Sequence, residues 1–355
     1  MFSPYFPTRA LAFGIAAVAL GLSGQPAQAE DFYAGKQIDF QIGGNPGGGY
    51  DTYARTVSRH LAKYIPGKPS IINKNVPGAG SAKLATYMYN IAPKTGLIIG
   101  AVYPGAIMGP LLDPKLKGRY DPTKFEYLGS ADSGSRVCLT RKESKVKTFE
   151  DAMKQKVVLG ASQAGGSTRD YAIFLNATAG SKFEIVSGYK GSVDILLAVE
   201  RGEVEGLCGF DWSSLLSQRP QWAEKGAINV LLQMAPEADE DLKKMGVPIF
   251  WDYMKTEEQK QMGTLLVTQQ IFGRPYFVPP GTPKDRVKIL RDAMWKTFND
   301  ADYKKDALRA RLSVSPASGA KVEELVNRVY ATPAAVVEKA KAVMLPPGSA
   351  KKKKK

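Results

Sequence analysis

Histidine and cysteine are scarce in this chain of 355 residues, which contains one histidine, His60, and two cysteines, Cys138 and Cys208. This set cannot build a cysteine–histidine zinc cluster or a scaffold of several disulfides. Histidine is also the most common general base in enzymes, so the chain is poor in groups for acid–base catalysis. We therefore expect no metal and no other cofactor.

Long apolar runs are also missing. Arg9 precedes an apolar run from Ala10 to Leu22, and the small-residue site Ala27-Gln28-Ala29 follows it. This order is typical of a secretory signal peptide over residues 1–29, with cleavage after Ala29. The run is shorter than the roughly 20 residues that span a bilayer, and no later segment is long and apolar enough to span one. We expect an exported, soluble mature chain without a lipid anchor, because no cysteine follows the cleavage site.

Acidic residues are fewer than basic ones, 34 against 49, and the formal net charge is +15. Arg9 and the lysines of 351–355 account for six of these charges, which leaves +9. No interior stretch concentrates them into a basic stripe, so we do not expect nucleic acid as a partner. The charge suits anionic small molecules. Residues 349–355 are interpreted as a disordered, solvated lysine tail.

The mature chain alternates strand-like and helix-like segments, which is typical of α/β proteins with largely parallel strands. A first unit has strands near 38–42, 70–73 and 97–102, a helix over 51–65, and a second helix marked by Leu84, Met88 and Ile91. A second unit has a capping-box pattern, Thr148-x-x-Asp151, and the following elements: strands near 136–140, 157–160, 183–186 and 204–210, and a helix over 192–200.

The end of the chain is predicted to be helical. Thr282 is the expected N-cap of one helix, with Pro283 at its first position, and a last helix covers 333–344. We expect these helices to pack on the first unit. The predicted domain 1 is therefore discontinuous, 30–135 plus 252–348, and domain 2 is 136–251, with two chain crossings. Cys138 and Cys208 both lie in strand-like segments of domain 2, so they either pair or stay as two buried thiols.

Three glycine-rich turns stand between a strand and a helix, at 43–51, 77–81 and 164–168. Glycine brings backbone amides close to a ligand, and the first turn of a helix offers unpaired N–H groups with a partial positive charge. A carboxylate or phosphate is the natural occupant. The turns match neither the dinucleotide-binding nor the P-loop pattern. Such turns gather at the carboxyl ends of the strands, which predicts an anion held across a cleft. Ser167 or Thr168 is expected to cap its helix.

These motifs, together with Gly188-Tyr-Lys-Gly191 and Pro279-Pro-Gly-Thr-Pro283, stand in an order that resembles the TctC or Bug family over about 36–344. These are the periplasmic substrate-binding proteins of tripartite tricarboxylate transporters. The resemblance implies an α/β, two-lobed periplasmic-binding-protein fold (type II, venus-flytrap). It also implies a monomeric, non-enzymatic receptor that captures a di- or tricarboxylate and delivers it to membrane transporter subunits.

The resemblance also implies the ligand-binding residues. The first loop supplies Gly47, Gly48, Gly49 and Tyr50, the second-lobe loop supplies Ala164, Gly165, Gly166, Ser167 and Thr168, and a secondary wall consists of Gly78, Ala79 and Gly80. Residues that follow predicted strands are added as cleft candidates: Tyr103, Gly105, Ala106 and Asp211. Asp211 either accepts from a ligand or caps the next turn.

Two departures from the family pattern concern the ligand. Tyr50 replaces a small hydroxyl residue, and its expected role is to stack on a ring or to line an apolar slot. The expected role of Arg169 is to bind a distal carboxylate, which favours an aromatic or longer dicarboxylate. The alternative for each is a surface or packing role. We expect Asp51 and Arg55 to form a local ion pair and His60 to face solvent. A ligand-dependent sensor, or an exported enzyme that uses Ser167 or Asp211, remains an alternative function.

Overall fold

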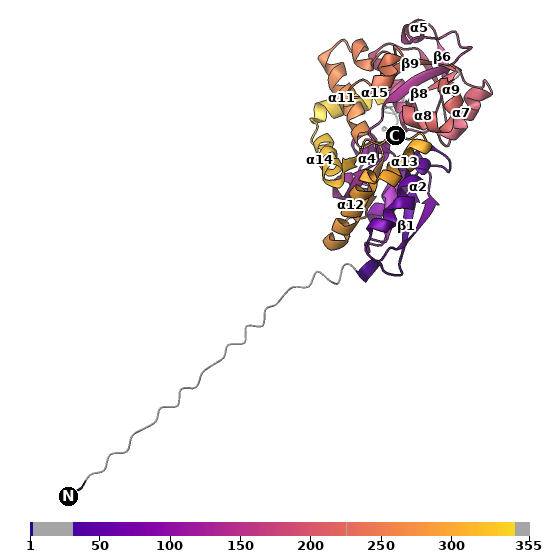
Figure 1. The fold of residues 1–355 in the computed structure, drawn as a ribbon. Coiled ribbons are helices and arrows are strands. Elements are labelled where there is room, and N and C mark those ends of the chain that lie inside the picture. The colour runs from indigo at the N-terminus through magenta and orange to yellow at the C-terminus, as the bar shows by residue number, and fades with distance from the viewer. Residues whose placement is uncertain (3–30, 225, 345–355) are drawn as a thin grey trace.

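A computed structural model describes residues 1–2, 31–224 and 226–344 of the chain. The described chain forms two lobes, each built on one sheet with helices packed around it, which confirms the two-lobed α/β fold (Figure 1). The predicted cleavage site and the lysine tail lie outside the described residues. Among the helices of the described part, none is long and apolar enough to cross a membrane.

The first sheet has six strands in the order β11-β4-β10-β3-β1-β2. β1 pairs in parallel with β2 and β3, whereas β10 is antiparallel to β3 and β4. The expectation of largely parallel strands is therefore only partly met. The strands are β1 (Gln37–Ile42), β2 (Ser70–Asn75), β3 (Ile98–Ala101), β4 (Glu126–Ser130), β10 (Pro275–Val278) and β11 (Ala317–Ser318).

The second sheet has five strands in the order β7-β6-β8-β5-β9 and is likewise mixed. Its strands are β5 (Arg136–Arg141), β6 (Val157–Ala161), β7 (Phe183–Ser187), β8 (Gly206–Asp211) and β9 (Ile228–Met234). The predicted capping box is confirmed, because the Thr148 hydroxyl accepts from the Asp151 amide and the Asp151 carboxylate accepts from the Thr148 amide.

The helices of the first lobe follow its strands closely. They are η1 (Asp31–Tyr33), α2 (Gly49–Leu61), η2 (Ala62–Tyr64), η3 (Ala79–Ser81), α3 (Ala82–Asn90), α4 (Pro104–Leu112) and η4 (Pro122–Lys124). The helix predicted over 51–65 ends at Leu61 and continues as a 3-10 turn. Ile91, one of the three residues that mark the predicted second helix, lies just past the end of α3 and is 71% exposed.

The helices of the second lobe are α5 (Phe149–Lys154), α6 (Ser167–Thr178), α7 (Ser192–Glu200), α8 (Trp212–Gln218), α9 (Pro220–Glu224), α10 (Glu240–Lys244) and η5 (Phe250–Tyr253). The closing helices are α11 (Glu257–Ile271), α12 (Lys284–Asn299), α13 (Ala301–Arg309), α14 (Gly319–Tyr330) and α15 (Ala334–Met344).

The N-cap of α12 is Pro283, so the prediction of Thr282 was wrong. The Thr282 hydroxyl instead donates to the Pro279 carbonyl in the preceding turn.

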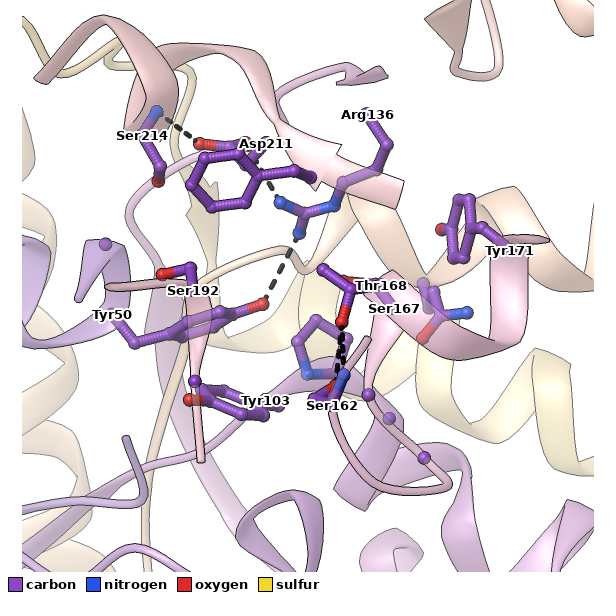
Figure 2. Close-up of a pocket in the computed structure, with 18 of the residues that line it drawn as sticks. Tyr50, Tyr103, Arg136, Ser162, Ser167, Thr168, Tyr171, Ser192, Asp211 and Ser214 are labelled. Atoms are coloured by element: carbon purple, nitrogen blue, oxygen red, sulfur yellow. Dashed lines mark hydrogen bonds and ion pairs between the residues drawn. The ribbon is translucent and has the colours of Figure 1, made fainter. Parts of the chain in front are cut away.

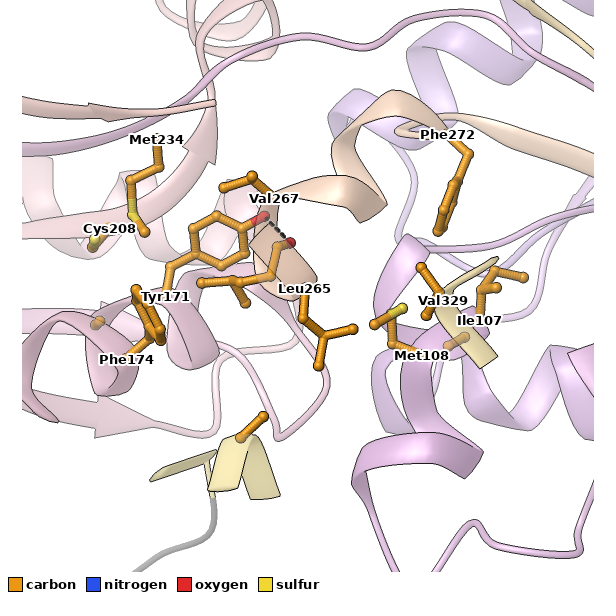
Figure 3. Close-up of a cluster of buried hydrophobic side chains, with 14 of the residues drawn as sticks. Ile107, Met108, Tyr171, Phe174, Cys208, Met234, Leu265, Val267, Phe272 and Val329 are labelled. Carbon is orange, nitrogen blue, oxygen red and sulfur yellow. Dashed lines mark hydrogen bonds between the residues drawn. The ribbon is translucent and has the colours of Figure 1, made fainter. Parts of the chain in front are cut away.

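The chain passes between the sheets twice, after β4 and again between β9 and β10. α12, α13 and α14 pack on the first lobe as expected, but α15 also contacts α6 and α11. One hydrophobic cluster extends from the second sheet through α11 to α4 and α14 (Figure 3). Tyr171 and Phe174 of α6 face Leu265 and Val267 of α11 in this cluster. The lobes therefore share a continuous core on the α11 side.

A β-bulge places the two cysteines opposite each other. Between Val137 and Leu139 of β5, two residues of β8, Cys208 and Gly209, oppose the single residue Cys138. Gly209 has φ +73°, and a Cβ there would lie 2.3 Å from the Ser167 carbonyl oxygen, so glycine is needed at the bulge. The structure brings the sulfur atoms of Cys138 and Cys208 together as a disulfide across 70 residues.

We expect this disulfide to form under oxidising conditions. Alkylation of the unfolded, unreduced chain should label no thiol, and two labels should appear only after reduction. Replacing both cysteines with alanine should lower the free energy of unfolding by about 4 kcal/mol, because a cross-link of this span restricts the unfolded chain. Two labelled thiols before reduction would show that the cysteines are separate.

Candidate functional site

A cavity of about 630 Å³, including its mouth, lies between the two lobes (Figure 2). Residues from both lobes line it, together with Gln269 and Arg274 from the second chain crossing. They are Gly49, Tyr50, Tyr103, Pro104, Gly105, Arg136, Ser162, Gly165, Gly166, Ser167, Thr168, Tyr171, Gly191, Ser192, Phe210, Asp211, Ser214, Gln269 and Arg274.

Four helices of eight or more residues begin at this cavity, two from each lobe. The first lobe presents the starts of α2, at Gly49 and Tyr50, and of α4, at Gly105. The second lobe presents the starts of α6, at Ser167, and of α7, at Ser192. Each helix start leaves N–H groups without an intrahelical partner and carries a partial positive charge. The cavity is therefore suited to an anion held by both lobes.

The start of α2 is fixed by a local network. The Gly47 amide donates to Asp51 Oδ2 at 2.9 Å, and Arg55 Nε lies 2.8 Å from Asp51 Oδ1, which confirms the predicted ion pair. A Cβ at Gly49 would lie 2.2 Å from Ser214 Oγ of the second lobe. Glycine at this position therefore lets the two lobes approach each other closely.

Hydroxyl groups order the start of α6. Thr168 Oγ1 accepts from the Ser162 amide at 3.0 Å and lies 2.8 Å from Ser162 Oγ. The N-cap of the helix is Gly166 and no side chain caps it, so the prediction that Ser167 or Thr168 is the N-cap was wrong. The Thr168 hydroxyl instead fixes the loop that leads into the helix.

A buried charge cluster forms one wall of the cavity. Asp211 Oδ1 lies 2.6 Å from Arg274 Nη2, and Asp211 Oδ2 lies 3.1 Å from Arg136 Nη1. Asp211 also caps α8 by accepting from the Ser214 amide. Burial raises the pKa of this carboxyl group, but Arg274 and Arg136 outweigh burial and lower the pKa to about 2. The buried Asp132, whose pKa is raised by burial and by the Asp211 charge and lowered by Arg274, belongs to the same cluster but does not line the cavity. The charged groups that line the cavity are thus two arginines and one carboxylate.

Tyr50, which follows the first glycine-rich loop, lines the cavity. The rings of Tyr50 and Tyr103 are 4.3 Å apart between centroids. The guanidinium carbon of Arg274 lies 4.3 Å from the centroid of Tyr50 and 4.5 Å from that of Tyr53, so the arginine is within cation–π distance of both rings. Tyr50 is thus held in place by cation–π and ring contacts and presents an apolar surface to a ligand.

Several residues that the sequence predicts to bind the ligand do not line this cavity. Gly47 and Gly48 belong to the loop before α2 but are not among the lining residues. A second cavity, of about 930 Å³, is lined in part by Ala79, Gly80, Ala164 and Arg169. Arg169 pairs there with Asp170 at 2.9 Å.

The remaining candidates lie outside the main cavity. Gly78 faces a third cavity. His60 was expected to face solvent, but its side chain is only 16% exposed and its Nε2 lies 3.0 Å from Asp306.

Arg136, Arg274, Ser192 and Gln269 also line the cavity, although the sequence patterns do not predict them as site residues. Ser192 follows the Gly188–Gly191 motif, and its position at the start of a predicted helix was a usable signal. Arg136 and Arg274 carry no local signal, because their roles depend on contacts with residues more than 60 positions away. Within the described residues no group of three or more potential metal ligands occurs.

Comparison with solved structures places the chain in the fold of periplasmic solute-binding proteins. The periplasmic binding protein BugD superposes with a TM-score of 0.69 at 17% identity, over 87% of this chain and 98% of that chain. MatC from Rhodopseudomonas palustris, with bound malate, gives 0.65 at 18% identity over 87% and 99%. R. palustris Rpa4515 with adipate gives 0.67 at 18% over 86% and 97%.

No protein-family model matches the sequence, and no curated protein matches it. The similarity to the solved structures shows that the chain has their two-lobed fold, in agreement with the predicted architecture.

Proposed function

We propose that this chain is a periplasmic receptor of the TctC/Bug kind, which captures an organic carboxylate between its lobes and delivers it to a membrane transporter. The observation that carries the proposal is the convergence of four helix starts, two from each lobe, on one cavity. A ligand that accepts hydrogen bonds from both lobes stabilises the closed arrangement, which a transporter can distinguish from the open one.

The charge of the cavity supports an anionic ligand. Arg136 and Arg274 outnumber Asp211, and the partial charges of the helix starts add to this positive potential. Two structures of the same fold contain the dicarboxylates malate and adipate. We therefore propose a carboxylate of this size class, bound by the backbone amides near Gly49, Tyr50 and Ser167.

A binding role is favoured over catalysis. The compared structures are binding proteins. Ser167 has no histidine near it, because the single histidine of the chain, His60, lies on the far part of α2 beside Asp306. Asp211 is held by two arginines, and its lowered pKa makes it a poor proton acceptor at neutral pH. We propose that the bound acid leaves unchanged.

Thermal-shift measurements on the mature chain with a panel of carboxylates test this function. A ligand at 100 times its Kd should add about 2.7 kcal/mol to the free energy of unfolding, which a clear rise in Tm reports. Mass analysis of the recovered ligand should show no chemical change. If no acid of the panel raises Tm at millimolar concentration, the receptor assignment fails.

A further inference from the structure

Arg136 is the first residue of β5 and stands where the chain enters the second lobe. Its side chain is 4% exposed, and it lines the cavity between the lobes. Figure 2 shows its guanidinium group pointing into the cavity, between Asp211 and the hydroxyl group of Tyr50. A buried cation at a ligand cavity needs strong acceptors, because removing it from water is costly.

The acceptors of Arg136 are unequal. On one side, Asp211 lies 3.1 Å from Nη1 and is itself held by Arg274 and by the Ser214 amide. On the cavity side, the Tyr50 hydroxyl lies 3.4 Å from Nη2, beyond the range of about 2.7–2.9 Å that charge-assisted bonds take. A neutral hydroxyl at this distance is a weak partner for a guanidinium group. The cavity face of Arg136 is therefore suited to a stronger, negatively charged acceptor.

Asp211 keeps the guanidinium group oriented toward that face. Asp211 is 2% exposed and bonded to Arg274 from the second chain crossing, so its position is fixed from both sides. Asp211 is one carboxylate shared by two arginines, and Asp132, the other carboxyl group close to Arg274, does not line the cavity. The remaining positive charge lies opposite no other carboxylate among the lining residues.

We propose that Arg136 determines ligand specificity: its guanidinium group binds a second acidic group of the ligand, while the helix starts hold the first. The role expected of Arg169 thus belongs to Arg136. This inference rests on the proposed function and adds to it that the receptor selects acids with two acidic groups over acids with one. A monocarboxylate would leave the cavity face of Arg136 without its charged acceptor, and such mismatches are strongly disfavoured in buried sites.

Calorimetric titration with matched acids tests the proposal. Each straight-chain dicarboxylate of four to eight carbons is compared with the monocarboxylate of equal length, and phthalate isomers are compared with benzoate. The wild-type protein should bind the best dicarboxylate about 10- to 100-fold more tightly than its monocarboxylate partner. In Arg136→Met the affinities for the dicarboxylate and the monocarboxylate should differ by no more than about threefold, mainly because the dicarboxylate binds more weakly.

Three further variants separate recognition from folding. Arg136→Lys keeps a charge but loses the planar fork, and should recover only part of the ratio. Arg136→Gln removes the charge but keeps a neutral hydrogen-bond donor beside Asp211, and should lose the ratio with less loss of stability than Arg136→Met. Arg141→Gln, at the other end of the same strand, should keep the wild-type ratio.

The outcomes distinguish the two proposals. If the wild-type protein binds no acid of the panel, the proposed function fails and the role of Arg136 falls with it. If dicarboxylates are preferred by the wild-type protein and by Arg136→Met to the same degree, the receptor function stands and the role of Arg136 is wrong. If the wild-type protein binds the dicarboxylate and the matched monocarboxylate with equal affinity, the proposed role of Arg136 is wrong as well.

Discussion

Replacing Gly105 with alanine is expected to abolish ligand binding while both lobes remain folded. Gly105 lies in the first turn of α4, and a Cβ there would stand 1.7 Å from the carbonyl oxygen of Gly165 in the second lobe. Both sides of this contact are backbone, so no side chain can move to relieve it. The lobes of Gly105→Ala should stay apart, and carboxylate affinity should fall at least 100-fold, because the ligand then contacts one lobe at a time.

Small-angle scattering and titration calorimetry check this expectation together. The variant should keep a larger radius of gyration than the wild-type protein at saturating ligand concentration. Gly109→Ala is the matched control on the same helix, because its Cβ would meet Leu116 and Tyr120 of its own lobe. That control should lose some stability and keep most of its affinity. Wild-type affinity in Gly105→Ala would show that binding does not need this approach of the lobes.

Arg274→Met is expected to lower the free energy of unfolding by about 3–5 kcal/mol, measured by urea unfolding at pH 7. The side chain of Arg274 is 2% exposed and lies 2.6 Å from Asp211. Its charge also opposes the rise in the pKa of Asp132 that burial and the nearby Asp211 charge cause. Without this cation, two buried carboxylates face each other with Arg136 as the remaining partner of Asp211.

The loss in Arg274→Met should depend on pH. In the wild-type protein the pKa of Asp211 is about 2, below its ordinary value of 3.8. The stability contributed by Asp211 is therefore fully present above about pH 4, and it is lost as the pH falls toward 2. In the variant the pKa of Asp211 rises, so the difference from wild type should shrink as the pH drops from 5 to 3. An exposed control, Arg201→Met, should cost less than about 0.5 kcal/mol at every pH.

The glycine turns were predictable from the sequence because each one is a local signal between a strand and a helix. Gly49, Gly165 and Ser167 indeed lie at the central cavity. The position of Gly78–Gly80 relative to that cavity was not predictable, because it depends on how far the lobes close. Gly80 instead lies against Ala164, and both residues line a neighbouring cavity.

The charged wall of the cavity was hidden for a different reason. Arg136 opens a strand and Arg274 precedes one, and neither carries a motif. Their pairing with Asp211 joins positions separated by 75 and 63 residues, and only the folded sheets bring these positions together.

Capping patterns were more reliable where a hydroxyl and a carboxylate act within one turn, as at Thr148 and Asp151.

The shared core along α11 has a consequence for dissection of the chain. Tyr171 and Phe174 of the second lobe are covered by α11, which follows that lobe in sequence and also packs on α4 and α14. A fragment limited to 136–251 would lack this helix and expose the apolar side of α6 to water. Such a fragment is expected to aggregate when expressed alone, and the intact molecule should melt in one calorimetric transition rather than two.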